Sequence, residues 1–117
     1  MTTINIQIGS KTFTAKLFDN ASSQALMAML PMTINMSELN GNEKYYHMPD
    51  GLLTNSQHVG TINTGDLMLY GSDCLVFFYK NFNTSYSYTR LGYIVDMSGL
   101  ANALGSGSVQ VVFSLAP

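Results

Sequence analysis

Alternation of apolar and polar residues at the start of the chain constrains its fold more than any other feature. Every second residue is apolar in two neighbouring stretches, and these residues are Ile4, Ile6 and Ile8, then Phe13, Ala15 and Leu17. A period of two is typical of a β-strand with one buried face. The short Gly9-Ser10 sequence between the stretches suits a tight turn, because such turns match the twist of paired strands. The chain therefore begins with a predicted β-hairpin.

Further strands are predicted along the rest of the chain. They cover residues 32–36, 43–48, 67–70, 74–80, 86–95 and 109–115. Turn sequences at 40–42 and 71–73 separate two pairs of these strands. Residues 75–79 are all apolar, which is typical of a strand that is covered on both faces. Residues 49–65 show no sustained period and are predicted to form a long loop.

Two segments change from the period of a strand to that of a helix. The first follows Asp19-Asn20, a typical helix N-cap sequence, and ends before Pro31. Its apolar residues at helical spacing are Ala21, Ala25, Leu26, Ala28, Met29 and Leu30. The second covers residues 97–104, with Asp96 or Ser98 as its cap, Gly105 after its end, and a predicted buried face of Leu100, Ala103 and Leu104.

This order of elements favours a mainly β fold. Regular alternation of strands and helices is absent, which argues against a parallel doubly wound sheet. A closed antiparallel barrel of about eight strands, with a short helix over each open end, removes the exposed sheet edges. An open α+β sheet is the alternative. We expect one domain over residues 1–117, because 46% hydrophobic content at this length is enough to bury a core.

Charge and termini limit the partners and the location. Only 10% of the residues are charged, against about 25% in a typical globular protein, and the net charge is -2. The five basic residues are scattered, so no basic stripe exists and we expect no nucleic-acid partner. No apolar run approaches the length of a membrane span, and the first ten residues do not look like a signal peptide. We therefore expect a cytoplasmic protein with no membrane partner.

Three stretches together resemble the bacterial and archaeal cyclophilin-like fold family over nearly the whole chain. They are residues 11–46, 60–94 and 98–113, and the most informative points are Leu30-Pro31 at the helix end and Gly65-Asp66 at a strand entry. The resemblance implies a cyclophilin-type closed barrel in a small protein of unassigned function.

Cyclophilins proper are peptidyl-prolyl isomerases, and the resemblance raises the question of that activity. Their chemistry uses an arginine on a barrel strand and an aromatic pocket for the proline ring. Where their pattern has Phe-His-Arg, this chain has Tyr45-Tyr46-His47, and it lacks both the later Gln-Phe-Phe pattern and tryptophan. A non-enzymatic binding module is therefore the favoured interpretation, since a fold alone does not carry an activity. A weak or divergent isomerase, with Arg90 as the donor, is the alternative.

The aromatic stretch at residues 77–90 is the best candidate for a binding surface. Tyr86, Tyr88 and Arg90 alternate, so they share one strand face, and both residue types are frequent at binding hot spots. Tyrosines lying on a solvated sheet face are the competing interpretation. The predicted groove is lined by Tyr45, Tyr46, His47, Tyr79, Phe82, Tyr86, Tyr88 and Arg90. Few charges and many Asn, Ser and Thr residues favour a peptide or a small neutral ligand.

Other chemistry has weaker support. The spacing of His47, Asp50 and His58 matches no zinc pattern, so we expect no metal, and nothing indicates a cofactor. Cys74, the single cysteine, is interpreted as a small buried thiol. The glycines of residues 105–108 follow a helix, which indicates a C-cap and turn and not a phosphate loop. A third hypothesis is an accessory or self-associating domain, which could form a homodimer. Eight methionines and low charge leave an adaptable surface for such contacts.

Overall fold

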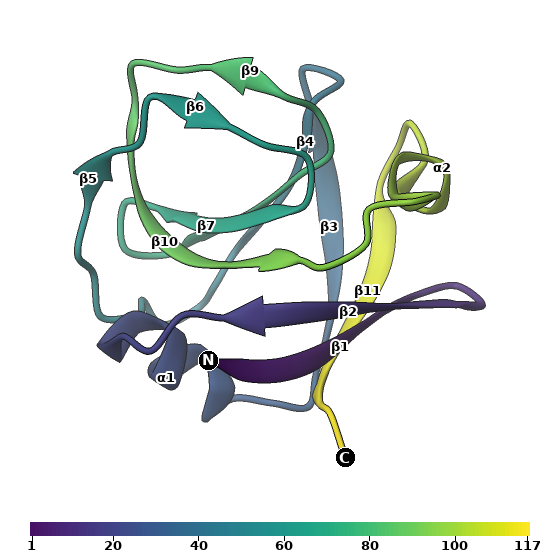
Figure 1. Cartoon of the computed structure of the whole chain (residues 1–117), viewed down its shortest axis with the longest axis horizontal. Helices are drawn as coiled ribbons and strands as arrows, with labels where there is room; N and C mark the ends of the chain where they lie inside the picture. The colour runs from purple at the N-terminus through teal and green to yellow at the C-terminus, as the bar shows by residue number, and fades with distance from the viewer.

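Eight antiparallel strands form a sheet that closes on itself in the computed structural model, which describes all 117 residues. Their order around the barrel is β2-β1-β11-β3-β4-β8-β7-β10, and pairing of β10 with β2 closes it (Figure 1). The strands are β1 (Thr2–Ile8), β2 (Lys11–Leu17), β3 (Met32–Leu39), β4 (Glu43–His47), β7 (Asp66–Tyr70), β8 (Cys74–Phe78), β10 (Ser87–Ile94) and β11 (Val109–Leu115). The predicted closed barrel is therefore confirmed, and the open sheet is excluded.

Three two-residue strands lie outside the predicted set. They are β5 (Gln57–His58), β6 (Thr61–Ile62) and β9 (Phe82–Asn83). β5 pairs with the start of β10, while β6 and β9 form a separate ribbon (Figure 1). The prediction of a long loop over residues 49–65 missed β5 and β6, because strands this short carry no detectable period.

Both helices are shorter than predicted. α1 (Ala21–Met27) is capped by Asn20, as predicted. The side-chain oxygen of Asn20 accepts a hydrogen bond from the amide of Ser23 at 2.8 Å. α2 (Leu100–Leu104) begins after Gly99 with no side-chain cap, so the prediction of Asp96 or Ser98 in that role was wrong. Asp96 instead accepts a hydrogen bond from the Ser98 amide in the turn before the helix. No helix of the structure has the length and apolar character needed to cross a membrane.

The buried face of α1 differs from the predicted apolar face. Ser22, Ser23 and Leu26 are buried. The Ser23 hydroxyl donates to the carbonyl of Leu91 at 2.8 Å, and the Asn20 amide group donates to the carbonyl of Arg90 at 3.1 Å. These bonds hold the serine side of the helix against β10, so several predicted core residues are exposed instead, namely Ala21, Ala28 and Met29.

The barrel interior is filled by a cluster of 20 buried hydrophobic residues. Every alternating apolar residue of the predicted N-terminal hairpin belongs to it, and so do Leu26 of α1 and Leu100 and Leu104 of α2. β11 contributes Val111 and Phe113, whereas Leu115 is exposed. The alternation therefore predicted the interior correctly, except at the end of the last strand.

A second, smaller cluster lies on the outer face of β8. Phe77 belongs to the interior core, whereas Phe78 belongs to this outer cluster together with Ile62 of β6. The ring of Phe82 in β9 packs on Phe78 with 5.7 Å between centroids. The prediction that this strand is covered on both faces is confirmed, and the β6–β9 ribbon supplies part of the outer cover.

Lys44 of β4 is fully buried, which the sequence did not predict. Its ammonium group donates to the carboxylate of Glu38 at 2.8 Å and to the carbonyls of Gly105 and Gly107 at 2.9 and 2.6 Å. The Tyr79 hydroxyl donates to the same carboxylate at 2.5 Å. This cluster joins the β3–β4 hairpin to the turn after α2. It also supports the prediction of a C-cap and turn for residues 105–108, because carbonyl oxygens there face a cation.

Candidate functional site

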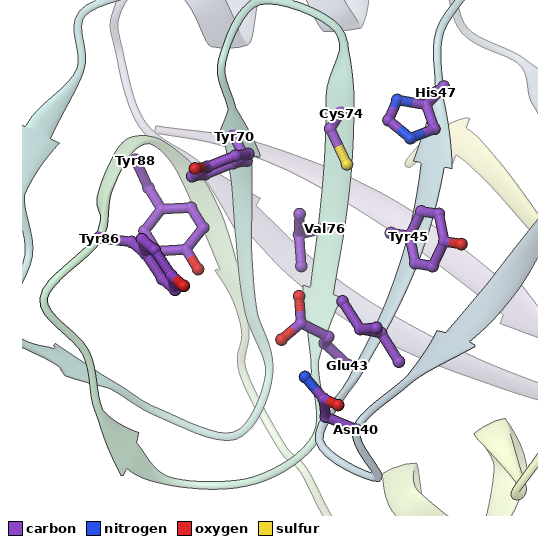
Figure 2. Close-up of a pocket in the computed structure, with 10 residues that line it drawn as sticks. Asn40, Glu43, Tyr45, His47, Tyr70, Cys74, Val76, Tyr86 and Tyr88 are labelled. Carbon is purple, nitrogen blue, oxygen red and sulfur yellow. The ribbon is translucent and has the colours of Figure 1, made fainter.

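A pocket of about 390 Å³ opens on the outer surface of the barrel, over β4, β8 and β7 (Figure 2). Its volume lies within the range of about 300–1,000 Å³ that is usual for small-molecule sites. Seven of its ten lining residues are hydrophobic. The lining consists of Leu39, Asn40, Glu43, Tyr45, His47, Tyr70, Cys74, Val76, Tyr86 and Tyr88.

Strand register explains why these residues meet. Side chains of a strand alternate between its two faces, so alternate residues of β4 point outward. Across the sheet, Tyr45 pairs with Val76 and His47 pairs with Cys74. The turn between β7 and β8 places Tyr70 opposite Cys74. The pocket floor is therefore set by backbone pairing.

Tyrosine rings form one wall of the pocket. The Tyr70 ring lies 5.8 Å from that of Tyr86 and 5.5 Å from that of Tyr88, at interplanar angles of 78° and 57°. Tyr88 packs edge-on against Phe78 at 5.6 Å. Tilted and edge-on pairs are favourable aromatic geometries, so the wall is preorganised. Tyr88 is only 5% exposed, which rules out the solvated-face interpretation for this residue, whereas Tyr86 is 61% exposed at the rim.

The pocket is electrostatically unfavourable for anions. Burial raises the pKa of Glu43, and the charge of Glu38 raises it further. Burial also raises the pKa of the Cys74 thiol, with contributions from Asp73 and Glu43. The pKa of Tyr88 is raised to about 12, mainly by burial and then by the charge of Glu43. Each shift disfavours a negative charge, and no lysine or arginine lines the pocket.

The structure brings four of the eight predicted groove residues into this pocket, namely Tyr45, His47, Tyr86 and Tyr88. The other four lie elsewhere. Tyr46 and Tyr79 pack against the interior core, and Tyr79 also bonds to Glu38. Phe82 packs against the outer cluster beside Phe78.

Arg90 is the fourth residue outside the pocket. A guanidinium nitrogen of Arg90 lies 3.4 Å from the carbonyl oxygen of Val59, in the connection between β5 and β6. The pairing of β10 with β7 shifts its register between Arg90 and Gly92. Arg90, the donor in the isomerase hypothesis, is therefore not among the residues that line the pocket.

Sequence reasoning missed six lining residues, which are Leu39, Asn40, Glu43, Tyr70, Cys74 and Val76. Two signals could have found three of them. The period of two groups Glu43 with Tyr45 and His47, and the predicted turn at 71–73 places Tyr70 opposite Cys74. Cys74 is half-buried in the pocket wall, so its interpretation as a small buried thiol was only partly correct.

The histidines are placed apart. Nδ1 of His47 lies 3.3 Å from a carboxylate oxygen of Asp73 at the pocket rim. His58 lies in β5, where it pairs with Ser87. No three His, Cys, Asp or Glu side chains come together in a way that could hold a metal ion.

The fold and the pocket together define a small cyclophilin-type barrel with an aromatic site on its outer face. The chain belongs to the Cyclophilin-like family, whose model matches residues 6–114. The solution structure of a hypothetical protein from Archaeoglobus fulgidus is similar, with a TM-score of 0.70 and 16% identity, and the match covers 98% of this chain and 95% of that protein. At this identity the likeness shows the fold alone. A search among curated proteins gives no match.

Proposed function

We propose that this cyclophilin-like domain is a non-enzymatic binding module whose tyrosine-lined pocket accepts a peptide or a small ligand. The observation that carries the proposal is the grouping of four tyrosines around one preformed cavity on the outer face of the barrel. The composition of the chain favours a ligand that is neutral overall.

Tyrosine suits this task for physical reasons. Its side chain supplies a large rigid contact area at low conformational cost, and its hydroxyl adds a hydrogen bond. Tyr88 is held by Phe78 and Tyr70, so little order has to be gained when a ligand binds. Tyr86 and Tyr70 are 61% and 47% exposed, which leaves them free to contact a ligand.

Heteronuclear NMR titration with a panel of blocked dipeptide amides tests the proposal. We expect the largest chemical-shift changes at Tyr45, Tyr70, Tyr86 and Tyr88. Tyr86→Ala should weaken binding without unfolding the domain, because the side chain is mostly exposed. Leu53→Ala is the matched control, since Leu53 is 63% exposed and does not line the pocket. Shifts spread evenly over the surface, or unaffected by Tyr86→Ala, would contradict the proposal.

The same panel decides between binding and isomerisation. A dipeptide amide with a prolyl bond that binds without faster cis–trans exchange agrees with a binding module. Faster cis–trans exchange of the prolyl bond that is lost in Arg90→Ala would instead establish the divergent isomerase. Light scattering addresses the self-association hypothesis, because a dimer that Tyr86→Ala dissociates would mean that a second copy covers the pocket.

A further inference from the structure

Glu43 is a half-buried carboxylate without a partner in the protein. It lines the pocket, yet its side chain takes part in no hydrogen bond and no ion pair. In Figure 2 the Glu43 carboxylate points into the pocket, and the hydroxyl ends of Tyr86 and Tyr88 point toward it from the other side. Partial burial costs a carboxylate part of its hydration, and no group of the protein offsets that cost at Glu43.

No lysine or arginine of the chain lines the pocket or pairs with Glu43. Lys44 follows Glu43 directly, but its side chain lies on the opposite face of β4 and its ammonium group is bonded to Glu38. Arg90 reaches the Val59 carbonyl outside the pocket. His47 is paired with Asp73 at the rim. No side chain of this protein therefore neutralises Glu43, which leaves this position in the pocket open to a cationic ligand.

We propose that the pocket binds the ammonium group of an amine, held by the Glu43 carboxylate and by the faces of the surrounding tyrosines. This inference rests on the proposed function and specifies its ligand class. Aromatic rings attract a cation through the negative potential of their faces, most strongly where water is excluded. The hydroxyl ends of Tyr86 and Tyr88 face the carboxylate, and Tyr70 and Tyr45 supply further rings elsewhere in the pocket lining (Figure 2).

The electrostatics of the lining agree with a cationic ligand. Burial is the main cause of the raised pKa values of Glu43, Cys74 and Tyr88, but negative neighbours contribute to each of them. A potential that disfavours anions favours cations. The low charge of the whole chain suggested a neutral ligand, whereas the negative charge inside the pocket indicates a ligand that carries an ammonium group.

Choline and its neutral isostere, in which a tert-butyl group replaces the trimethylammonium group, test the inference directly. The two probes have the same shape and differ in charge. We expect NMR titration to give choline an affinity about tenfold or more above that of the isostere, the difference expected for a partly desolvated cation–π and carboxylate site. The preference should decline as salt is added, because salt screens the interaction.

Glu43→Gln removes the charge and keeps the shape. Glu43 makes no hydrogen bond that this change would break, so the variant should fold. We expect choline to lose about tenfold in affinity while the neutral isostere keeps its own. Asp50→Asn is the matched control, because Asp50 is exposed, forms no ion pair and does not line the pocket. It should leave both affinities unchanged.

The outcomes separate the inference from the proposed function. Equal affinity for choline and its isostere, or an unchanged preference in Glu43→Gln, would overturn the ammonium site and leave a neutral binding pocket. Absence of tyrosine shifts with choline, its isostere and every dipeptide amide would overturn both. Blocked lysine methylamide then tests whether the ammonium group comes from a peptide side chain, and blocked norleucine methylamide is its uncharged control. Preference for the lysine compound over choline indicates a peptide side chain, and the reverse order indicates a small free ammonium compound.

Discussion

Glu38→Gln tests how much a buried ion pair stabilises this weakly charged barrel. The Lys44 side chain has no exposed surface, and its ammonium group has three oxygen partners, of which only the Glu38 carboxylate carries charge. Replacing Glu38 by Gln leaves the ammonium group buried without a counter-ion. The new amide NH2 group also faces the Gly41 amide, which donates to the other carboxylate oxygen at 2.7 Å.

The expected cost follows from these contacts. Removing one partner of a buried ion pair costs about 3–5 kcal/mol. Glu38 is 21% exposed and Gln keeps one acceptor for Lys44, so we expect a cost at or below the lower end of this range, about 2–3 kcal/mol. Lys44→Met should cost less, about 1 kcal/mol, because Glu38 retains its bonds from Tyr79 and Gly41 and some water.

Urea unfolding at neutral pH measures the difference. With a slope of about 1–3 kcal/mol per molar urea, Glu38→Gln should lower the midpoint by roughly 1–2 M. Asp50→Asn removes an exposed carboxylate and serves as the control. Equal midpoints for Glu38→Gln and Asp50→Asn, or a larger loss in Lys44→Met than in Glu38→Gln, would refute the reasoning.

The destabilisation caused by Glu38→Gln should depend on pH. Burial acts to raise the pKa of Glu38, but hydrogen bonds from Lys44, Tyr79 and Gly41 outweigh it and lower the pKa below its ordinary value of 4.5. A carboxyl group with a lowered pKa in the folded state contributes stability above its unfolded value and loses it as the pH falls through the folded value. The stability gap between the native protein and Glu38→Gln should therefore be constant near neutral pH and shrink below about pH 4.5.

Four further predictions concern barrel closure, the cap of α1 and the pocket. A Cβ at Gly92 would collide with the backbone of β2, so Gly92→Ala should cost about 3 kcal/mol or more in thermal unfolding, whereas Gly107→Ala, with open space around it, should cost little. Asn20→Ala removes the α1 cap and should cost about 1–2 kcal/mol in urea unfolding. Cys74 should react with a disulfide reagent more slowly than free cysteine, since its raised pKa limits the thiolate. Tyr88→Phe should remove a phenol that ionises near pH 12 from the absorbance titration.

The fold was largely predictable because its signals are local. Ile4, Ile6 and Ile8 predict a buried strand face from only five residues. The two-residue turn that follows then fixes the register of the next strand. That the barrel closes followed from the number of strands and from the need to remove sheet edges, whereas the pairing of β10 with β2 was not predicted. Each of these inferences needed only neighbouring residues or a general rule of sheets.

The features that were missed depend on contacts between distant segments. Ser23 bonds to a carbonyl 68 positions away, and Lys44 bonds to carbonyls 61 and 63 positions away. Neither partner can be inferred from local pattern, so a serine face and a buried lysine both appeared as ordinary polar residues. Arg90 was placed on the correct strand, but its length let it reach Val59 and leave the pocket.

The position of the pocket follows from an incomplete cover over β8. This strand is apolar on both faces, and the β6–β9 ribbon covers its outer face at Phe78 through Ile62 and Phe82. No residue of the β6–β9 ribbon lines the pocket. At the Cys74 end of β8, the outer face of the strand is therefore covered by tyrosine rings instead. Apolar surface left in water costs about 25 cal/mol per Å². A longer ribbon would have sealed this surface at a gain in stability, and tyrosine instead keeps it partly dry while leaving hydroxyls and ring faces accessible to a ligand.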